Sequence, residues 1–238
     1  MIRGIVLDLD DTLYEYSSLE PGAREAAEQY AERILKIEKS VFQRAVQIGK
    51  EKVKRQLLTV AAGHSRILYY QKALEELGYI PLSAAFELEQ IYWKFIFDRM
   101  RLREGAEELL NLVKGMGWKI GICTDLTAGV QLQKIRILGL ERWIDCIVTS
   151  EEAGVEKPHP EIFRLCLEKM GLDRNEVFLV GDNFSRDIEG AKKAGIWSIW
   201  YKRGETEKQT KEYPVIQNFS ELRRKIEDGI FKTEGFID

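Results

Sequence analysis

The stretch IVLDLDDT, residues 5–12, decides the fold of this 238-residue chain. Its apolar start, residues 5–7, ends at carboxylates, as a fully buried parallel strand does when it delivers side chains to the carboxyl edge of a sheet. A second apolar run, residues 177–180, is followed by Asp182 and Asp187. Because open α/β sheets bind their ligands at that edge, we expect acids from both ends of the sequence to share one site.

Carboxylates gathered in one place predict a bound cation. Two carboxylates about 4 Å apart repel each other by about 4 kcal/mol at an effective dielectric constant near 20, so such a site binds a divalent ion or takes up protons. Magnesium prefers ligand sets made entirely of oxygen atoms. We therefore expect Mg²⁺ as the cofactor.

Short apolar runs alternate with helical patterns through most of the chain. This alternation predicts an α/β fold with a doubly wound parallel sheet. The expected strands are residues 4–7, 119–123, 146–149, 177–180 and 197–200, and the expected helices are residues 106–113, 130–138, 161–170, 187–194 and 219–230.

The segment between the first two strands is the exception, because it contains no convincing strand. Helical apolar spacing recurs there in residues 21–35, 40–58, 65–77 and 83–100. A crossover between parallel strands needs only about a dozen residues, so we interpret this segment as an inserted all-helical cap domain. The predicted domains are a core of residues 1–14 and 102–238 and a cap of residues 15–101.

Composition excludes some classes of partner. The 36 basic and 39 acidic residues are interspersed, with a net charge of −3, so we expect no nucleic-acid partner. No apolar run approaches the roughly 18 residues of a membrane span, and the start of the chain shows no signal-peptide pattern. Three widely spaced cysteines without a Cys-x-x-Cys pair predict free thiols in a reducing compartment. We expect a cytoplasmic protein without a membrane partner.

Four separated pieces of sequence fall at or just after predicted strand ends. They are Asp8-x-Asp10-x-Thr12, Thr124, Lys157 in Glu156-Lys157-Pro158, and Asp182 with Asp187. In residue type and order they resemble the four motifs of the haloacid dehalogenase superfamily, over residues 2 to about 204. The resemblance implies a phosphatase with a Rossmann-like core and a helical C1 cap.

The resemblance also implies catalytic roles. Asp8 would attack phosphorus to form an aspartyl-phosphate, and Asp10 would protonate the leaving oxygen and then activate the water that clears the intermediate. Thr124 would hydrogen-bond a phosphoryl oxygen, and Lys157 would supply positive charge.

The remaining motif residues are assigned to the metal and its surroundings in the same way. The implied Mg²⁺ ligands are the carboxylates of Asp8 and Asp182 and the backbone carbonyl of Asp10. Thr12 would support the phosphate-binding loop, and Asp187 would orient the motif lysine or a metal-bound water.

Other reactions remain open at this point. Asp10 favours phosphoester hydrolysis over the carbon–halogen cleavage of dehalogenases, whereas a phosphomutase would keep this residue. A receiver or sensor protein would also gather acids, threonine and lysine at a sheet edge, without turnover.

Residues 156–163 and 180–195 resemble the branch that contains N-acylneuraminate-9-phosphatases and pyrimidine nucleotidases, which implies a sugar phosphate or nucleoside monophosphate as substrate. One departure is Thr124-Asp125-Leu126, where that branch more usually has Thr-Asn-Gly, so the resemblance does not extend to the shape of this loop.

Substrate contacts are the least specific part of the sequence. Tyr14 and Tyr16 follow the nucleophile loop and are expected near the cap hinge. Arg66, Tyr69 and Tyr70 share one face of a predicted helix, where they would either contact substrate or simply pack. The expected partner is a small phosphorylated metabolite, and the expected assembly is a monomer or homodimer.

Overall fold

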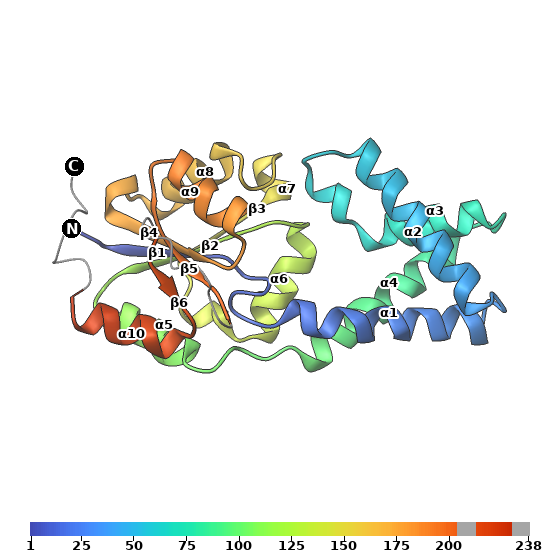
Figure 1. The fold of residues 1–238 in the computed structure, drawn as a ribbon, viewed down its shortest axis with the longest axis horizontal. Coiled ribbons are helices and arrows are strands. Elements are labelled where there is room, and N and C mark those ends of the chain that lie inside the picture. Colours follow the sequence, from blue (N-terminus) through green and yellow to red (C-terminus); the bar gives the residue numbers. More distant parts are fainter. Residues whose placement is uncertain (204–212, 230–238) are drawn as a thin grey trace. The chain divides into compact units, whose positions relative to one another are not determined.

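The computed structural model of this chain describes residues 1–203 and 213–229 (Figure 1). The chain forms two compact units, one made of residues 1–15 and 101 onward and the other of residues 16–100. In the described part of the chain, no helix has the length and apolar character needed to cross a membrane.

The first unit is built on a six-stranded sheet in which every strand pair is parallel. The strand order is β3-β2-β1-β4-β5-β6, so the chain builds outward from β1 on one side and then returns to build on the other. This confirms the predicted doubly wound sheet, with its switch point beside β1. The strands are β1 (Gly4–Leu7), β2 (Lys119–Thr124), β3 (Cys146–Thr149), β4 (Val177–Gly181), β5 (Trp197–Tyr201) and β6 (Val215–Ile216).

Helices cover both faces of this sheet. In Figure 1, α8 and α9 lie on one side and α5 and α10 on the other. The helices are α5 (Ala106–Gly115), α6 (Ala128–Ile137), α7 (Ser150–Ala153), α8 (Pro160–Met170), α9 (Glu189–Lys193) and α10 (Phe219–Glu227), with shorter turns η2 (Leu140–Arg142), η3 (Arg174–Glu176) and η4 (Phe184–Ile188), the last a π-helical turn.

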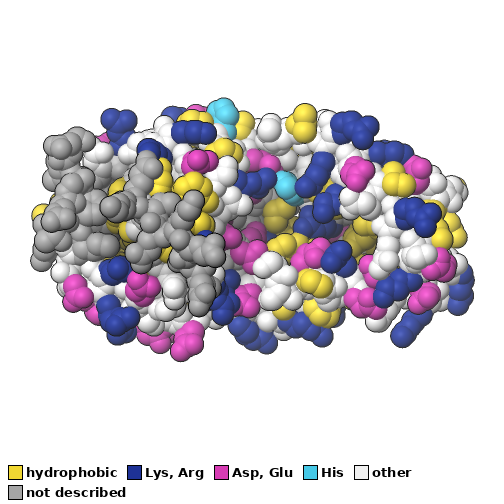
Figure 2. Space-filling model, in the orientation of Figure 1, with side chains coloured by type: hydrophobic (Ala, Val, Ile, Leu, Met, Phe, Trp, Pro, Cys, Tyr) yellow, Lys and Arg dark blue, Asp and Glu magenta, His cyan; other side chains and the backbone are white. Residues whose placement is uncertain are grey.

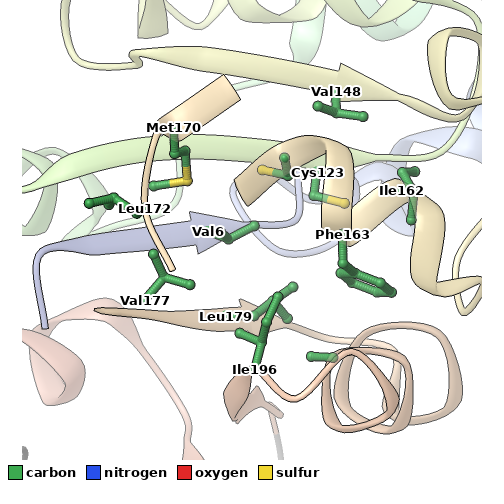
Figure 3. Packing of buried hydrophobic residues seen from close by; sticks show 12 residues of the cluster. Val6, Cys123, Val148, Ile162, Phe163, Met170, Leu172, Val177, Leu179 and Ile196 are labelled. Atoms are coloured by element: carbon green, nitrogen blue, oxygen red, sulfur yellow. The ribbon is translucent and has the colours of Figure 1, made fainter. Parts of the chain in front are cut away.

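The core under α8 fixes the direction of the side chains at the end of β1. Val6 points into a buried cluster with Leu179 of β4 and with Ile162 and Phe163 of α8 (Figure 3). Because side chains alternate across a strand, a residue two positions after Val6 projects toward the same face. That residue is Asp8, which therefore leaves the sheet edge on the α8 side.

The second unit is entirely helical among its described residues. Its elements are α1 (Tyr16–Arg33), α2 (Lys39–Gln56), η1 (Ala61–His64), α3 (Arg66–Glu76) and α4 (Leu82–Arg99).

The predicted start of the first of these helices was wrong. Helical apolar spacing suggested a start at Pro21, and proline is favoured in the first turn of a helix. The structure begins α1 five residues earlier, at Tyr16, and places Pro21 inside the helix. Close packing explains why the helix continues, because a β-carbon on the adjacent Gly22 would collide with the ring of Phe95 in α4. This tertiary contact outweighs the backbone hydrogen bond that proline cannot donate.

Candidate active site

Asp8 is fixed immediately beyond the end of the central strand. Its backbone N–H donates to the carbonyl of Val180 at 3.0 Å, which extends the pairing of β1 with β4 by one residue. The side chain is 7% exposed. Its Oδ1 accepts a hydrogen bond from Lys157 Nζ at 2.7 Å, and its Oδ2 accepts one from Thr12 Oγ1 at 2.8 Å. Both carboxylate oxygens are therefore oriented by donors from other parts of the chain.

Lys157 joins the two ends of the chain at this point. Its buried ammonium also donates to Oδ1 of Asp187 at 2.6 Å. The other oxygen of Asp187 accepts the backbone N–H of Asn183 at 2.9 Å. A β-carbon on Gly181 would lie 2.5 Å from Oδ2 of Asp187, so glycine at this position leaves room for the carboxylate.

Asp182 is held by contacts through its backbone as well as its side chain. Its N–H donates to Thr12 Oγ1 at 3.1 Å, and its carbonyl accepts the indole N–H of Trp200 at 2.7 Å. These contacts place the carboxylate beside the loop that follows β1.

Three carboxylates meet here in an arrangement that fits a divalent cation. One carboxylate oxygen from each of Asp8, Asp182 and Asp187 lies within 4.8 Å of the others. Lys157 is the lysine bonded to this group, so three acids face one positive charge. A set of oxygen donors with excess negative charge has the chemistry that Mg²⁺ prefers.

Electrostatics in the metal-free site raise the pKa values of Asp8 and Asp182. Burial raises the pKa of Asp182 to about 6, and the charge of Asp187 adds to this effect. Burial also raises the pKa of Asp8; the charge of Lys157 offsets only part of this effect, and the charges of Asp187 and Asp182 raise the pKa further. Burial lowers the pKa of Lys157, but the negative charges around it, first those of Asp187 and Asp8, outweigh this effect and raise the pKa, so the lysine stays charged. A bound cation would favour ionised Asp8 and Asp182.

Asp10 lies in different surroundings, although it follows Asp8 by only two residues. Lys134 Nζ donates to its Oδ1 at 2.6 Å, Gln131 Nε2 donates to its Oδ2 at 2.9 Å, and the hydroxyl of Tyr14 donates to Oδ1. Burial raises the pKa of Asp10, but the charge of Lys134 and these hydrogen bonds outweigh it and lower the pKa. Asp10 is therefore held as a carboxylate. Tyr14, expected near substrate, is fully buried against it.

Gln131 and Lys134 were not singled out from the sequence. Both are fully buried and lie one turn apart on α6, which follows the Thr124 loop. Besides Asp10, Gln131 Nε2 contacts Thr124 Oγ1 at 2.5 Å, so this amide connects two motif residues. The sequence could have indicated these two residues, because a glutamine and a lysine on the inner face of a predicted core helix are buried polar groups and require partners.

The unusual Asp125-Leu126 pair keeps a tight loop after β2. Asp125 accepts the backbone N–H of Lys157 at 3.0 Å and the Nη1 of Arg186 at 2.9 Å, and so fixes the segment that carries the lysine. Leu126 has a φ of +87°, the left-handed conformation that favours glycine. The loop thus adopts a backbone shape suited to glycine without having glycine at this position.

The other residues expected to contact substrate lie in the helical unit. Tyr16 begins α1, and its hydroxyl accepts a hydrogen bond from Arg66 Nη2. Arg66, Tyr69 and Tyr70 line a cavity between helices of that unit. Tyr69 and Tyr70 are largely buried, and the Tyr69 hydroxyl donates to the carbonyl of Gly63 at 2.7 Å.

Comparison with known proteins relates this chain to one family of hydrolases. The sequence profile of the family described as haloacid dehalogenase-like hydrolases matches residues 2–195. A ribulose-1,5-bisphosphate 5-phosphatase from Halopiger xanaduensis is 34% identical over 207 residues, which cover 86% of this chain and 87% of the relative. A glyceraldehyde 3-phosphate phosphatase from Pyrococcus abyssi is 30% identical over 208 residues, covering 86% of this chain and 83% of the relative.

Solved structures show the same fold. The crystal structure of a 2-haloacid dehalogenase from Pseudomonas syringae superposes with a TM-score of 0.79 at 22% identity, covering 96% of this chain and 99% of that one. At this level of identity the likeness concerns the fold alone.

Proposed function

The chain belongs to the haloacid dehalogenase-like hydrolases, and we propose that it is a Mg²⁺-dependent phosphatase of a small phosphorylated metabolite. One observation carries the proposal: buried Asp8, Asp187 and Lys157 and half-buried Asp182 form a single group at the carboxyl edge of the sheet, and Asp10 lies two residues from Asp8 among separate donors. The two phosphatases with 34% and 30% identity support it.

In the first proposed step, Asp8 attacks the phosphorus atom and the bond from phosphorus to the leaving oxygen breaks. The product is an aspartyl-phosphate on Asp8. Asp10 gives the leaving alkoxide a proton, so the alcohol departs neutral. Because Asp10 rests as a carboxylate beside Lys134, we propose that it takes up this proton from the solvent as the dianionic substrate binds.

In the second proposed step, Asp10 accepts a proton from a water molecule that attacks the same phosphorus atom. The bond between phosphorus and Asp8 breaks, which releases inorganic phosphate and restores the Asp8 carboxylate. Asp10 then gives the proton taken from water to the solvent as phosphate leaves, and so returns to its resting carboxylate form. Tyr14 and Gln131 orient the Asp10 carboxylate in both steps, because each donates to it in the resting site.

Charge balance assigns the remaining roles. Lys157 and the hydroxyl of Thr124 stabilise the charge on the transferring phosphoryl oxygens. Mg²⁺ held by Asp8, Asp182 and the backbone carbonyl of Asp10 would supply the positive charge that three carboxylates and one lysine lack. Asp187 lies beside Asp8 and Asp182, with one carboxylate oxygen of each within 4.8 Å of the others. Its ion pair with Lys157 supports a role in holding that lysine.

Sugar phosphates are the first substrates to test, because the two phosphatase relatives are named for phosphorylated sugars. Nucleoside monophosphates are the second class to test. We propose that the helical unit acts as a cap that limits access of water during the reaction. The proposed setting is the cytoplasm, with the protein acting as a monomer or homodimer.

Phosphate release from p-nitrophenyl phosphate tests the proposal. We expect turnover with Mg²⁺ and its loss with EDTA. Asp8→Asn should remove turnover while leaving the circular dichroism spectrum unchanged, because the substitution keeps the shape of the side chain but removes the nucleophile.

The matched control is Asp228→Asn, an exposed aspartate at the end of α10. This variant should keep wild-type turnover. Substantial activity in purified Asp8→Asn would overturn the nucleophile assignment, and absence of metal-dependent turnover with all phosphorylated metabolites tested would favour a receiver or sensor instead.

A further inference from the structure

The helical unit contains a cavity of its own. Its volume is about 430 Å³, within the range of about 300 to 1,000 Å³ that is usual for small-molecule sites. Its lining comes from all four long helices of this unit and includes Phe42, Lys50, Lys54, Arg66 and Tyr70. All lining residues belong to the same compact unit.

The two carboxylates that line this cavity are already engaged. Glu20 forms an ion pair with Arg24 at 3.0 Å. Glu28 accepts a hydrogen bond from Gln43 Nε2 at 2.9 Å and lies 3.5 Å from Lys39. Each acid therefore already has a partner other than Lys50, Lys54 and Arg66.

Three cations of the lining have no carboxylate partner among the described residues. Lys50, Lys54 and Arg66 form no ion pair with an acid in that part of the chain. Burial lowers the pKa of Lys50, and the positive charges of Lys54 and Arg66 lower it further. Lys and Arg side chains are also numerous on the face of the helical unit that Figure 2 shows. The cavity therefore has a surplus of positive charge.

Arg66 is held in place by groups that do not cancel its charge. Its Nη1 donates to the carbonyl of His64 at 2.6 Å. The guanidinium carbon lies 5.4 Å from the ring centre of Tyr69, 5.2 Å from that of Tyr92 and 5.7 Å from that of Trp93. These neutral contacts orient a full positive charge before any ligand arrives, which reduces the entropy lost on binding.

We propose that this cavity binds the phosphate group of a small organic phosphate through Lys50, Lys54 and Arg66. Arg66 supplies a planar, oriented donor, and the two lysines supply mobile charge beside it. Phe42 and Tyr70, whose ring centres are 6.2 Å apart, add an apolar wall for the organic part of the ligand. This site goes beyond the reaction at Asp8 and does not depend on it.

Calorimetry on the metal-free protein tests the proposal directly. EDTA stops the proposed turnover, and the carboxylates around Asp8 then repel anions. We expect fructose 6-phosphate to bind and uncharged fructose not to bind. The double variant Lys50→Gln/Lys54→Gln should weaken the binding of fructose 6-phosphate at least tenfold, and added salt should weaken the wild-type interaction.

The matched control is Arg44→Gln, which removes a positive charge from an exposed position of the same helix outside the cavity. It should bind like the wild type. The proposal is overturned if the wild type binds fructose 6-phosphate no better than fructose, or if the double variant binds it as tightly as the wild type does. A failure of the phosphatase proposal would show separately, as absence of turnover of p-nitrophenyl phosphate with Mg²⁺.

Kinetics of the Mg²⁺-loaded protein distinguish two kinds of ligand that could carry the phosphate group bound in the cavity. If the group belongs to a substrate with two phosphates, the KM for fructose 1,6-bisphosphate rises at least tenfold in the double variant. If it belongs to a regulatory ligand, fructose 6-phosphate changes the turnover of p-nitrophenyl phosphate in a saturable way without being hydrolysed. Either result supports an organic-phosphate site in the cavity.

Discussion

Two aspartates separated by one residue experience opposite electrostatic environments in this site. Asp8 lies among carboxylates and a single lysine, and its pKa is raised by burial and by its acidic neighbours. Asp10 is surrounded by donors, and Lys134 with these donors lowers its pKa despite burial. Surroundings that differ in this way allow one loop to hold two carboxyl groups with different chemical tasks.

The Asp10–Lys134 ion pair makes a prediction about stability. The Lys134 side chain is fully buried, so Lys134→Met leaves Asp10 without its cation and should reduce the free energy of unfolding by about 2 kcal/mol. Adding Asp10→Asn removes the uncompensated charge. Urea unfolding of both single variants and the double variant should then give a coupling energy of about 1 to 3 kcal/mol. Strictly additive losses would show that the pair does not act as a unit.

The carboxylate cluster predicts a link between pH and metal binding. The folded pKa of Asp182 is about 6, above the value of about 3.9 for an unfolded chain. Its protonation therefore stabilises the metal-free fold most fully below the unfolded pKa, and this contribution is lost as pH rises through about 6. Mg²⁺ competes with that proton. The rise in melting temperature on adding Mg²⁺ to EDTA-treated protein should be larger at pH 7.5 than at pH 5.

An equal rise at the two pH values would contradict this account. The Asp182→Asn variant is the internal control, because it keeps the fold but lacks the titrating group. Its response to Mg²⁺ should be smaller than that of the wild type at pH 7.5.

At the scale of elements, the loop between β2 and α6 stores backbone strain at Leu126. A non-glycine residue in the left-handed region costs about 1 to 2 kcal/mol, which glycine does not incur. Leu126→Gly should therefore be more stable than Leu126→Ala by about 1 kcal/mol in urea unfolding. At Leu132, an exposed position within α6, the order should reverse, because alanine is the better helix former. The same order at both positions would mean that Leu126 is not strained.

Most elements of the first unit could be predicted from local pattern. The expected strand at residues 146–149 is β3, and the expected helix at residues 161–170 is α8, which begins one residue earlier at Pro160. Such elements have clear signals, since buried strands are continuous apolar runs and Gly171, with a φ of +60°, ends the helix. The two-residue strand β6 has no such pattern.

The start of α1 shows where this reasoning fails. Local preference puts proline at the beginning of a helix, but packing against α4 extends the helix through Pro21. The start of α1 depends on the contact of Gly22 with Phe95, which lie far apart in sequence. Helix propensity alone does not predict this contact.

At the scale of the whole molecule, the sequence allowed part of the candidate site to be predicted. Asp8 and Asp182 were expected together because parallel strands end at one edge, and the structure brings their carboxylates within 4.8 Å. The donors that hold Asp10 could not be foreseen in this way. Gln131 and Lys134 lie on a helix whose pattern indicates only packing, and their orientation toward Asp10 depends on the assembled fold.

The identity of the substrate belongs to this scale too. The motif residues act on a phosphoryl group that many metabolites share, so they do not select among its carriers. Selection requires groups outside the motifs, and Lys50, Lys54 and Arg66 would supply them if the phosphate group proposed for the cavity belongs to the substrate.

In the proposed reaction the phosphoryl group is transferred to Asp8 before water releases it as phosphate. Acid quenching during turnover tests this transfer most directly. Wild-type protein mixed with p-nitrophenyl phosphate and Mg²⁺ should be stopped in acid within the first turnover and analysed by peptide mass spectrometry. We predict one phosphoryl group on the peptide that contains Asp8, and none in Asp8→Asn. Wild-type turnover without that modified peptide, or with the phosphoryl group on another residue, would contradict the account.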